Sequence, residues 1–353
     1  MTTEAFFPEP MQLKVQAAAL QVKDATDGKQ WNLEAKDIQW CAAHDMIISC
    51  SRRTDIPAAY TRWLLQRLAA GYCVVPNPAN ANQVTRVSLR PEDVDVIVFW
   101  SKNPAPLIPH LAGLDAQGYR YYFQFTLNGY DRVIEPNVPD LAAGIDVFRT
   151  LSRLIGSNRV IWRYDPVILS RKTDVNYHID RFSLIARALA GCTRRVVVSI
   201  VDPYRRTERG FQILDRNGYE VQRDLSRSEA LGALISRMAE IARQSAFEIQ
   251  SCAEKIDLRP FGVQSGKCID DALIERAFGL RVSGSKDPSQ RPLCGCVKSR
   301  DIGMYDSCPE GCRYCYATHP HAGTVHTVPR HDENSPSLLG WFDAEAPDAA
   351  GKE

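Results

Sequence analysis

The sequence of 353 residues lacks long apolar runs and an excess of charge of either sign. No stretch reaches the roughly 18 apolar residues that a membrane-spanning helix needs. Residues 1–11 contain acidic residues and prolines where a secretion signal needs a basic end and an apolar stretch. We therefore expect a soluble, cytoplasmic protein with no membrane partner. Because 43 Lys and Arg face 42 Asp and Glu, no overall field attracts nucleic acid.

Two common catalytic signatures are also missing from the sequence. Neither standard form of glycine-rich phosphate-binding loop occurs. Four of the seven histidines lie in the C-terminal tail, so no Ser-His-Asp arrangement is indicated. We interpret His44, His110 and His178 as structural or solvated residues. The composition, with 44% hydrophobic and 24% charged residues, is that of a globular protein and excludes a fibrous or fully disordered chain.

A short apolar run, a polar loop and a stretch with helical spacing recur from residue 46 onward. Strands are predicted at 46–49, 73–75, 94–100, 121–125, 160–163, 196–201 and 247–251. Helices are predicted at 57–70, 141–155, 177–189, 229–242 and 270–278. Strands that alternate with helices predict parallel strands joined by helical crossovers. The number of units favours an α/β fold of the (β/α) TIM-like barrel type, with a doubly wound open sheet as the alternative.

The chain divides into four predicted parts. Residues 1–45 form an N-terminal extension, and residues 46–285 form the barrel. Residues 286–340 form a cysteine-rich metal- or cluster-binding segment, within which residues 319–340 are expected to fold over the site as a lid. Residues 341–353 are acidic and small, and we expect a disordered tail there.

Polar and ionisable residues follow the predicted strands at the end where parallel barrels place their reactive groups. The catalytic candidates are Arg52, Asp55, Lys102, Arg163, Asp165, Glu254 and Lys255. The candidates for cofactor or substrate binding are Asn103, Thr126, Ser199 and Asp202. A charged cup of this kind suits a small molecule or nucleobase that carries carboxylate, phosphate or amino groups. The alternative for each residue is a loop cap or a surface ion pair.

Cysteines are concentrated near the C-terminal end, where five of the eleven lie within residues 294–315. Cys308, Cys312 and Cys315 have the spacing C-x3-C-x2-C, with Tyr314 before the last of them. Three thiolates on one loop can hold three irons of a [4Fe–4S] cluster and leave the fourth iron open. Tyr314 would shield the cluster or contact a ligand. The alternative is a zinc ion held by Cys294, Cys296, Cys312 and Cys315, which leaves Cys308 unused.

Four further cysteines in the same half of the chain, Cys252, Cys268, Cys294 and Cys296, suffice for a second cluster or a zinc site. The alternative is that Cys252 or Cys268 is a small buried residue, which is common for cysteine.

The stretch CPEGCRYCYA at 308–317 resembles the cluster-binding motif of the radical S-adenosylmethionine superfamily, and within it the spore photoproduct lyase-like group. The wider pattern looks like a bacterial and archaeal family of unknown function, with a match over residues 46–340. The quoted segments are SRRTDIP at 51–57, WSKNP at 100–104, RYDP at 163–166, CAEKID at 252–257 and DIGMYDSC at 301–308. Because the motif lies near the end of this chain, the resemblance implies a circularly permuted barrel in which 301–305 forms a strand beside 46–49.

The resemblance also implies a reaction. Cys308, Cys312 and Cys315 would ligate the cluster, and the open iron would bind the amino and carboxylate groups of S-adenosylmethionine. An electron from a ferredoxin or flavodoxin would then yield a 5′-deoxyadenosyl radical that abstracts hydrogen from the substrate, in a lyase or oxidoreductase reaction. Two other functions stay open: a barrel hydrolase or lyase with a structural zinc site, and a nucleic-acid-processing protein with basic patches at 194–195 and 204–209.

Overall fold

The computed structural model describes residues 20–23, 30–33, 38–40, 46–78, 80–226, 228–318 and 331–342. Most of the predicted extension, residues 319–330 of the predicted lid and all but residues 341 and 342 of the predicted tail lie outside the described residues. Residues 331–342 pack against the N-terminal part of the fold: Trp63 Nε1 donates to the Ser335 carbonyl over 2.9 Å, and Val74 N donates to the Pro336 carbonyl over 2.8 Å.

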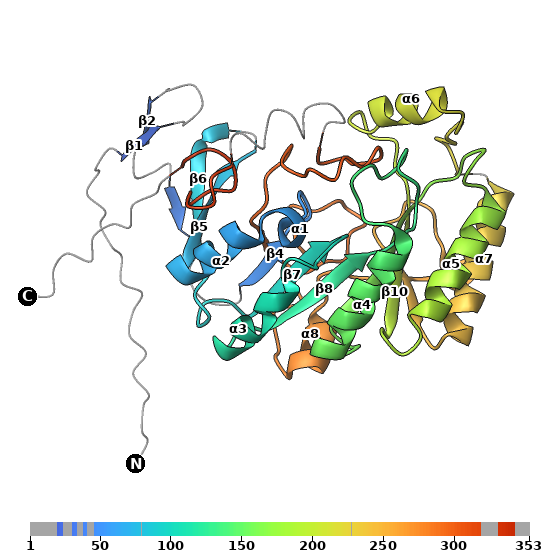
Figure 1. Cartoon of the computed structure of the whole chain (residues 1–353), viewed down its shortest axis with the longest axis horizontal. Coiled ribbons are helices and arrows are strands. Elements are labelled where there is room, and N and C mark those ends of the chain that lie inside the picture. The colour runs from blue at the N-terminus through green and yellow to red at the C-terminus, as the bar shows by residue number, and fades with distance from the viewer. Residues whose placement is uncertain are drawn as a thin grey trace, which may run out of the picture.

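The described chain alternates strands and helices along most of its length (Figure 1). The strands are β1 (Leu20–Lys23), β2 (Gln30–Leu33), β3 (Ile38–Trp40), β4 (Ile47–Cys50), β5 (Tyr72–Asn77), β6 (Asn80–Ser88), β7 (Val96–Ser101), β8 (Tyr121–Thr126), β9 (Val160–Val167), β10 (Arg195–Ile200), β11 (Glu248–Ser251), β12 (Gln264–Ser265) and β13 (Arg300–Asp301). The α-helices are α1 (Ile56–Ala59), α2 (Thr61–Ala70), α3 (Leu111–Ala116), α4 (Leu141–Ile155), α5 (Val175–Ala188), α6 (Glu208–Arg216), α7 (Glu229–Gln244) and α8 (Asp271–Phe278).

The main sheet has eight parallel strands in the order β12-β11-β10-β9-β8-β7-β4-β13. From β4 to β12 each of its strands lies beside the one that precedes it in the chain within this sheet, and Figure 1 shows β4, β7, β8 and β10 following one another across the molecule. The prediction of parallel strands joined by helical crossovers is confirmed. From β4 to β12 the order does not reverse, so this part of the sheet lacks the switch point of the doubly wound alternative, and the last strand, β13, lies at the opposite edge beside β4.

The prediction of a closed barrel was wrong. β12 and β13 are the edge strands of the described sheet, which is open. In a closed barrel, one face of this sheet would line the interior. Here that face is covered by α8 and by the cysteine-containing segments that precede and follow α8 in the chain. Ile47, Val98 and Tyr122 on the sheet pack in one buried cluster with Leu273 and Ile274 of α8. This face is therefore covered by other segments of the chain, while β12 and β13 lie at opposite edges and do not pair with each other.

The opposite face of the sheet carries the larger core. The strand residues that alternate with those of the covered face, such as Phe99, Phe123 and Trp162, pack there with residues from α2, α4, α5 and α7. Alternate residues of a strand point to opposite faces, so the same strands serve both cores. None of the described helices has the length and hydropathy that crossing a bilayer requires.

A second, smaller sheet contains β3, β6 and β5. β5 includes the predicted strand 73–75, but it pairs antiparallel with β6 instead of joining the main sheet. The apolar run at 73–75 predicted the strand correctly, but the strand was expected in the main sheet. Its true partner, β6, was not predicted because β6 is more polar.

Helix ends follow the capping residues in the sequence. The Asp140 side chain accepts from Ala143 N at the start of α4, and Gly156 follows its last residue. Asp270 and Gly279 bound α8 in the same way, with Gly279 at a φ of +65°. The predicted helix 57–70 is divided into α1 and α2 at Tyr60, whose backbone leaves the helical region.

The predicted strand at 301–305 is present in shorter form as β13, and it lies beside β4 as expected. The Asp301 carboxylate secures this contact. It accepts hydrogen bonds from Ser49 Oγ over 2.8 Å, Ser51 Oγ over 2.7 Å and Arg52 N over 2.8 Å. The chain then passes directly from β13 into the cysteine motif.

His178 gives a test of the larger core. Its side chain is fully buried between Tyr164 and the Ile168 carbonyl, and burial lowers its pKa to about 4. Between pH 6.5 and 4 the unfolded state therefore binds a proton that the folded state excludes, and stability falls as the pH falls. We expect a loss of about 3 kcal/mol over this window, measured by urea unfolding.

The comparison variants separate His178 from other titrating groups. Because His178→Gln cannot take up this proton, its free energy of unfolding should approach that of wild type as the pH falls toward 4. His110 is exposed, so His110→Gln should show the same pH dependence as wild type. An unchanged pH dependence in His178→Gln would contradict the buried, neutral state of His178.

Candidate active site and cysteine loop

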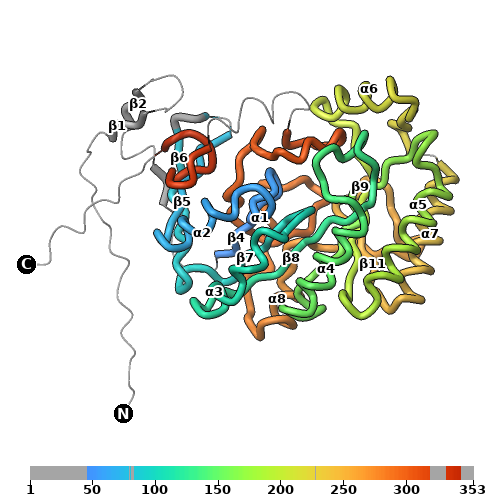
Figure 2. The backbone as a smooth tube through the Cα atoms, viewed as in Figure 1, coloured from blue at the N-terminus to red at the C-terminus, as the bar shows by residue number. Residues whose placement is uncertain are grey.

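The cysteine loop, residues 308–315, follows β13 and lies against the loop that follows β8. Arg313 N donates to the Ile134 carbonyl over 3.0 Å, and Asn137 Nδ2 donates to the Pro309 carbonyl over 2.7 Å. Figure 2 shows this orange-to-red segment passing above α1 toward the green loop. The loop therefore lies near the carboxyl ends of the strands, where the sequence places the reactive groups.

Two glycines allow the loop its conformation and its packing. Gly311 has a φ of +70°, which favours glycine. Gly210 of α6 lies directly against the loop, and a Cβ at this position would be 1.7 Å from the Arg313 carbonyl oxygen. Helix α6 can therefore pack here only because position 210 has no side chain.

Backbone N–H groups face two of the three thiols in the loop. Those of Asp55 and Glu310 face Cys308, and those of Ala317 and Thr318 face Cys315. Burial raises the pKa of Cys308 to about 12 and raises that of Cys315 as well. The N–H groups favour thiolates at positions where burial alone disfavours them, as in sites where a metal holds the sulfur deprotonated.

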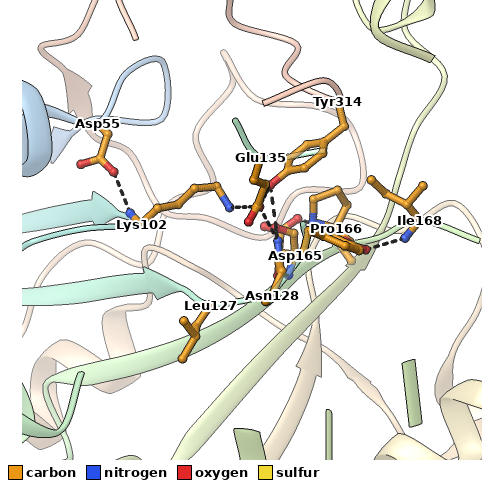
Figure 3. Close-up of polar contacts among 12 residues, drawn as sticks. Asp55, Lys102, Leu127, Asn128, Glu135, Asp165, Pro166, Ile168 and Tyr314 are labelled. Carbon is orange, nitrogen blue, oxygen red and sulfur yellow. Dashed lines mark hydrogen bonds and ion pairs between the residues drawn. The ribbon is translucent and has the colours of Figure 1, made fainter. Parts of the chain in front are cut away.

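Lys102 supplies positive charge near Cys312, the buried thiol at the centre of the loop. Its ammonium bonds to Glu135 Oε1 over 2.8 Å, with the two side chains only 15% and 4% exposed (Figure 3). Burial would lower the pKa of Lys102, but Glu135 and the Cys312 thiol outweigh it and raise the pKa. Lys102 is therefore a permanent cation next to the loop.

Glu135 connects this ion pair to the end of β9. The Tyr314 hydroxyl donates to Glu135, and Asn128 Nδ2 donates to Glu135 Oε1 over 3.2 Å (Figure 3). Asn128 also holds the backbone of Asp165, donating to its carbonyl over 3.0 Å and accepting from its N–H over 2.8 Å. Tyr314 thus positions the network from the cysteine loop itself.

Asp55 is buried and has its oxygens fully engaged. It accepts from Ala58 N, Ser101 Oγ and Lys102 N, over 3.0, 2.7 and 2.6 Å. Burial raises its pKa although these bonds oppose the shift. Because its acceptors bind protein groups, Asp55 caps the start of α1, which corresponds to the loop-cap alternative for this catalytic candidate.

Asp165 is the partly open carboxylate of the site, with 23% of its side chain exposed. It accepts from the Arg163 guanidinium and from the Ser199 hydroxyl. Burial would raise its pKa, but Arg163 and Ser199 outweigh burial, so the pKa is lowered and Asp165 stays ionised. Arg163 and Arg52 both lie over the Trp100 ring, 5.1 and 5.3 Å from its centroid.

The remaining candidates form a more exposed group. Lys255 and Arg291 both pair with Asp202, over 3.1 and 2.8 Å. Glu254 accepts from Ile200 N over 3.0 Å, and burial raises its pKa to about 8. Ion pairs and loop contacts of this kind are the alternative to a catalytic role that the sequence left open for each of these residues.

Two predicted binding residues have no evident part in the site. Asn103 accepts from Ala105 N over 3.4 Å within its own turn, and Thr126 pairs with Arg163 in the sheet register only. Sequence reasoning missed Glu135 and Asn128, which lie in the loop after β8 and not at a strand end. Only their contacts from distant parts of the chain identify them.

The other four predicted metal ligands lie together at the covered face of the sheet. The Cys252 and Cys268 sulfurs are 3.2 Å apart, and Cys296 lies near enough to Cys268 and Cys294 to raise the pKa of both thiols. The predicted zinc arrangement that joined Cys294 and Cys296 to the loop thiols is therefore not the grouping observed. Within the described residues, no group of three or more His, Cys, Asp or Glu side chains is arranged to hold a metal ion.

Comparisons with known proteins give a family and no activity. The family model described as a domain of unknown function (DUF1848) matches residues 47–317. No curated protein matches the chain. Among solved structures, a proposed alpha-L-fucosidase from Bacteroides thetaiotaomicron is 13% identical and matches 58% of this chain and 82% of its own, with a TM-score of 0.21. At that score the likeness supports no conclusion about this chain.

Removal of Lys102 tests the buried ion pair. Lys102→Met leaves Glu135 buried without its cation, and we expect a loss of about 3 kcal/mol in the free energy of unfolding. The matched control is Lys255→Met, whose pair with Asp202 has 71% of the lysine side chain exposed and should contribute less than about 1 kcal/mol. Equal losses in urea unfolding would show that Lys102 is not the cation of a buried pair.

Packing of the loop is tested at Gly210. Gly210→Ala introduces a methyl group into the Arg313 carbonyl, so the loop must move and its thiols should be alkylated faster by a maleimide under native conditions. Gly113→Ala in α3 is the control, since a Cβ there meets no atom within 4 Å. Peptide mass spectrometry of Cys312 measures the rates, and identical rates in the two variants would contradict the close approach.

Proposed function

The chain belongs to the family described as a domain of unknown function (DUF1848), and we propose that it is an iron–sulfur enzyme similar to the radical S-adenosylmethionine superfamily. Cys308, Cys312 and Cys315 are the proposed ligands of one [4Fe–4S] cluster. The observation that carries the proposal is the placement of three thiols on one tightly packed loop, faced by backbone N–H groups and by the Lys102 ammonium.

The residues of the loop fit such a cluster. In a [4Fe–4S] cluster of this kind, each of three irons takes one thiolate. The three ligands therefore need not converge on a single ion. Within the described residues, Glu310 Oε2 is buried without a hydrogen-bond partner, and it lies in the loop between Cys308 and Cys312. An unsatisfied buried oxygen at this position is consistent with a ligand that fills the neighbouring space.

A cluster with one open iron, when bound, supplies an electron to a sulfonium ligand such as S-adenosylmethionine, which is the chemistry of the superfamily. The residues of this chain prepare the site for it. Lys102 offsets negative charge on the loop, and Glu135 fixes the position of Lys102. Tyr314 and Asn128 hold Glu135 in place. Cys312 is buried at the centre of the loop, whereas Cys308 and Cys315 are half-buried.

Asp165, Arg163 and the Trp100 ring are the groups best suited to contact a substrate. Asp165 is ionised and partly exposed, so it can accept hydrogen bonds from amino or hydroxyl groups. The Trp100 ring carries two guanidinium groups, and its Nε1 is buried without a partner within the described residues. A small polar molecule or a nucleobase fits these groups by chemistry, with a ferredoxin or flavodoxin as the proposed reductant in a cytoplasmic setting.

A second candidate function, a hydrolase or lyase without a radical step, has one observation in its favour. Glu254, with a pKa raised to about 8 chiefly by burial, lies within electrostatic reach of the ionised Asp165. One protonated and one ionised carboxyl group form a pair that can act as general acid and base. For a nucleic-acid function the support is weaker, since Arg206 of the basic patch pairs with Asp306 over 3.3 Å.

Metal analysis of anaerobically purified protein tests the cluster. We expect about four irons and four sulfides per chain that depend on the loop, and loss of this iron in Cys312→Ser. The matched control is Cys192→Ser, a half-buried thiol outside both cysteine groups, which should keep the full content. If Cys312→Ser retains all the iron and sulfide of wild type, the loop does not hold the cluster.

A further inference from the structure

Cys252, Cys268, Cys294 and Cys296 come from three segments that meet at the covered face of the sheet. Cys252 follows β11, Cys268 precedes α8, and Cys294 and Cys296 precede β13. The Cys252 and Cys268 sulfurs are 3.2 Å apart. Cys296 lies near enough to Cys268 and to Cys294 to raise the pKa of both. The convergence of four thiols from three segments is therefore not explained by treating each as an ordinary small buried residue.

Nitrogen donors are directed at two of the four sulfurs. Ile269 N donates to Cys296 Sγ over 3.3 Å, and Arg163 Nη1 donates to Cys268 Sγ over 2.8 Å. The Arg52 guanidinium lies close enough to Cys296 that the sulfur raises the pKa of Arg52. A set of four thiolates needs nearby positive charge and N–H donors to be stable in a buried site, and groups of this kind orient and tune metal-bound sulfur.

The surroundings of the four thiols are apolar. Cys268, Cys294 and Cys296 are buried in the same cluster as Tyr122, Leu273 and other apolar residues, and Cys252 packs against that cluster. The proposed radical reaction uses none of these cysteines. Zinc and iron–sulfur centres with four cysteine ligands have no open position, which suits a site walled in by apolar side chains.

We propose that Cys252, Cys268, Cys294 and Cys296 bind a second metal centre, closed by four thiolates and separate from the cysteine loop. The ligand is a thiophilic centre, either one tetrahedral ion such as Zn²⁺ or one iron–sulfur cluster. The described thiols are not yet arranged as metal ligands, so loading moves them apart. With Zn–S bonds of about 2.3 Å, tetrahedral thiolates lie about 3.8 Å from one another, against 3.2 Å between Cys252 and Cys268.

The centre would hold together the segments at the covered face of the sheet. It joins the end of β11 to the segments on both sides of α8, which are the segments that occupy the place of a barrel interior. Arg163 links this centre to the candidate active site, because its guanidinium bonds to Cys268 on one side and to Asp165 on the other. The second centre therefore positions Arg163 as well as α8.

The experiment uses full-length protein in which Cys308, Cys312 and Cys315 are all replaced by serine, so that any metal left belongs elsewhere. Zinc, iron and sulfide are measured after anaerobic purification. We expect either one zinc or an iron–sulfur cluster of about four irons per chain; the first result identifies a single ion and the second a cluster. Adding Cys294→Ser or Cys252→Ser should reduce this content at least about tenfold, whereas adding Cys192→Ser should not.

Circular dichroism and size-exclusion chromatography verify that each variant is folded, and having two different cysteine variants guards against the failure of one. A folded loop-triple variant without zinc or iron, or with a disulfide between Cys252 and Cys268, overturns the proposal. Metal content that survives both added substitutions overturns it as well. The outcome is independent of the loop cluster, because that cluster is assessed from the difference between wild type and the triple variant.

Discussion

The position of the cysteine loop depends on the pairing of β13 with β4. β13 has only two residues, yet the Asp301 carboxylate fastens it by accepting from two serine hydroxyls and the Arg52 N–H. Parallel pairing brings the chain out at the same end as the other strands. The loop that follows is therefore placed near the carboxyl ends of strands from much earlier in the chain, and no separate domain is needed to carry it.

Two buried cations of the site are each paired with a carboxylate. Lys102 is matched by Glu135, and Asp165 is matched by Arg163. Removing either partner from water is costly, so each pair holds its geometry rigidly. The two pairs are linked through Asn128, which bonds to Glu135 and to the backbone of Asp165. A change in charge on the cysteine loop would therefore affect the position of Asp165 through the contacts of Glu135 and Asn128.

Local sequence patterns predicted elements well where the signal is local. Apolar β-branched runs identified β7, β9 and β10, and aspartate caps with terminal glycines bounded α4 and α8. Closure of the sheet could not be predicted, because it depends on how residues 266–299 pack on the sheet. Glu135 escaped notice for the same reason: it lies nine residues beyond β8, and its role comes from Lys102 and from Tyr314, which is 179 residues away. The cysteine groups were identified by spacing, but only the fold shows which thiols lie together.

The cysteine loop matters most for what this protein does, and low-temperature EPR of the reduced, anaerobically purified protein examines it most directly. Spectra are recorded with and without S-adenosylmethionine, in wild type and in a variant that lacks Cys252 and Cys294. A [4Fe–4S] signal that shifts on addition of S-adenosylmethionine in both proteins is the predicted result, because an open iron binds the added ligand. A cluster signal that the ligand leaves unchanged, or a protein that contains zinc and no iron, would contradict an open-iron cluster at Cys308, Cys312 and Cys315.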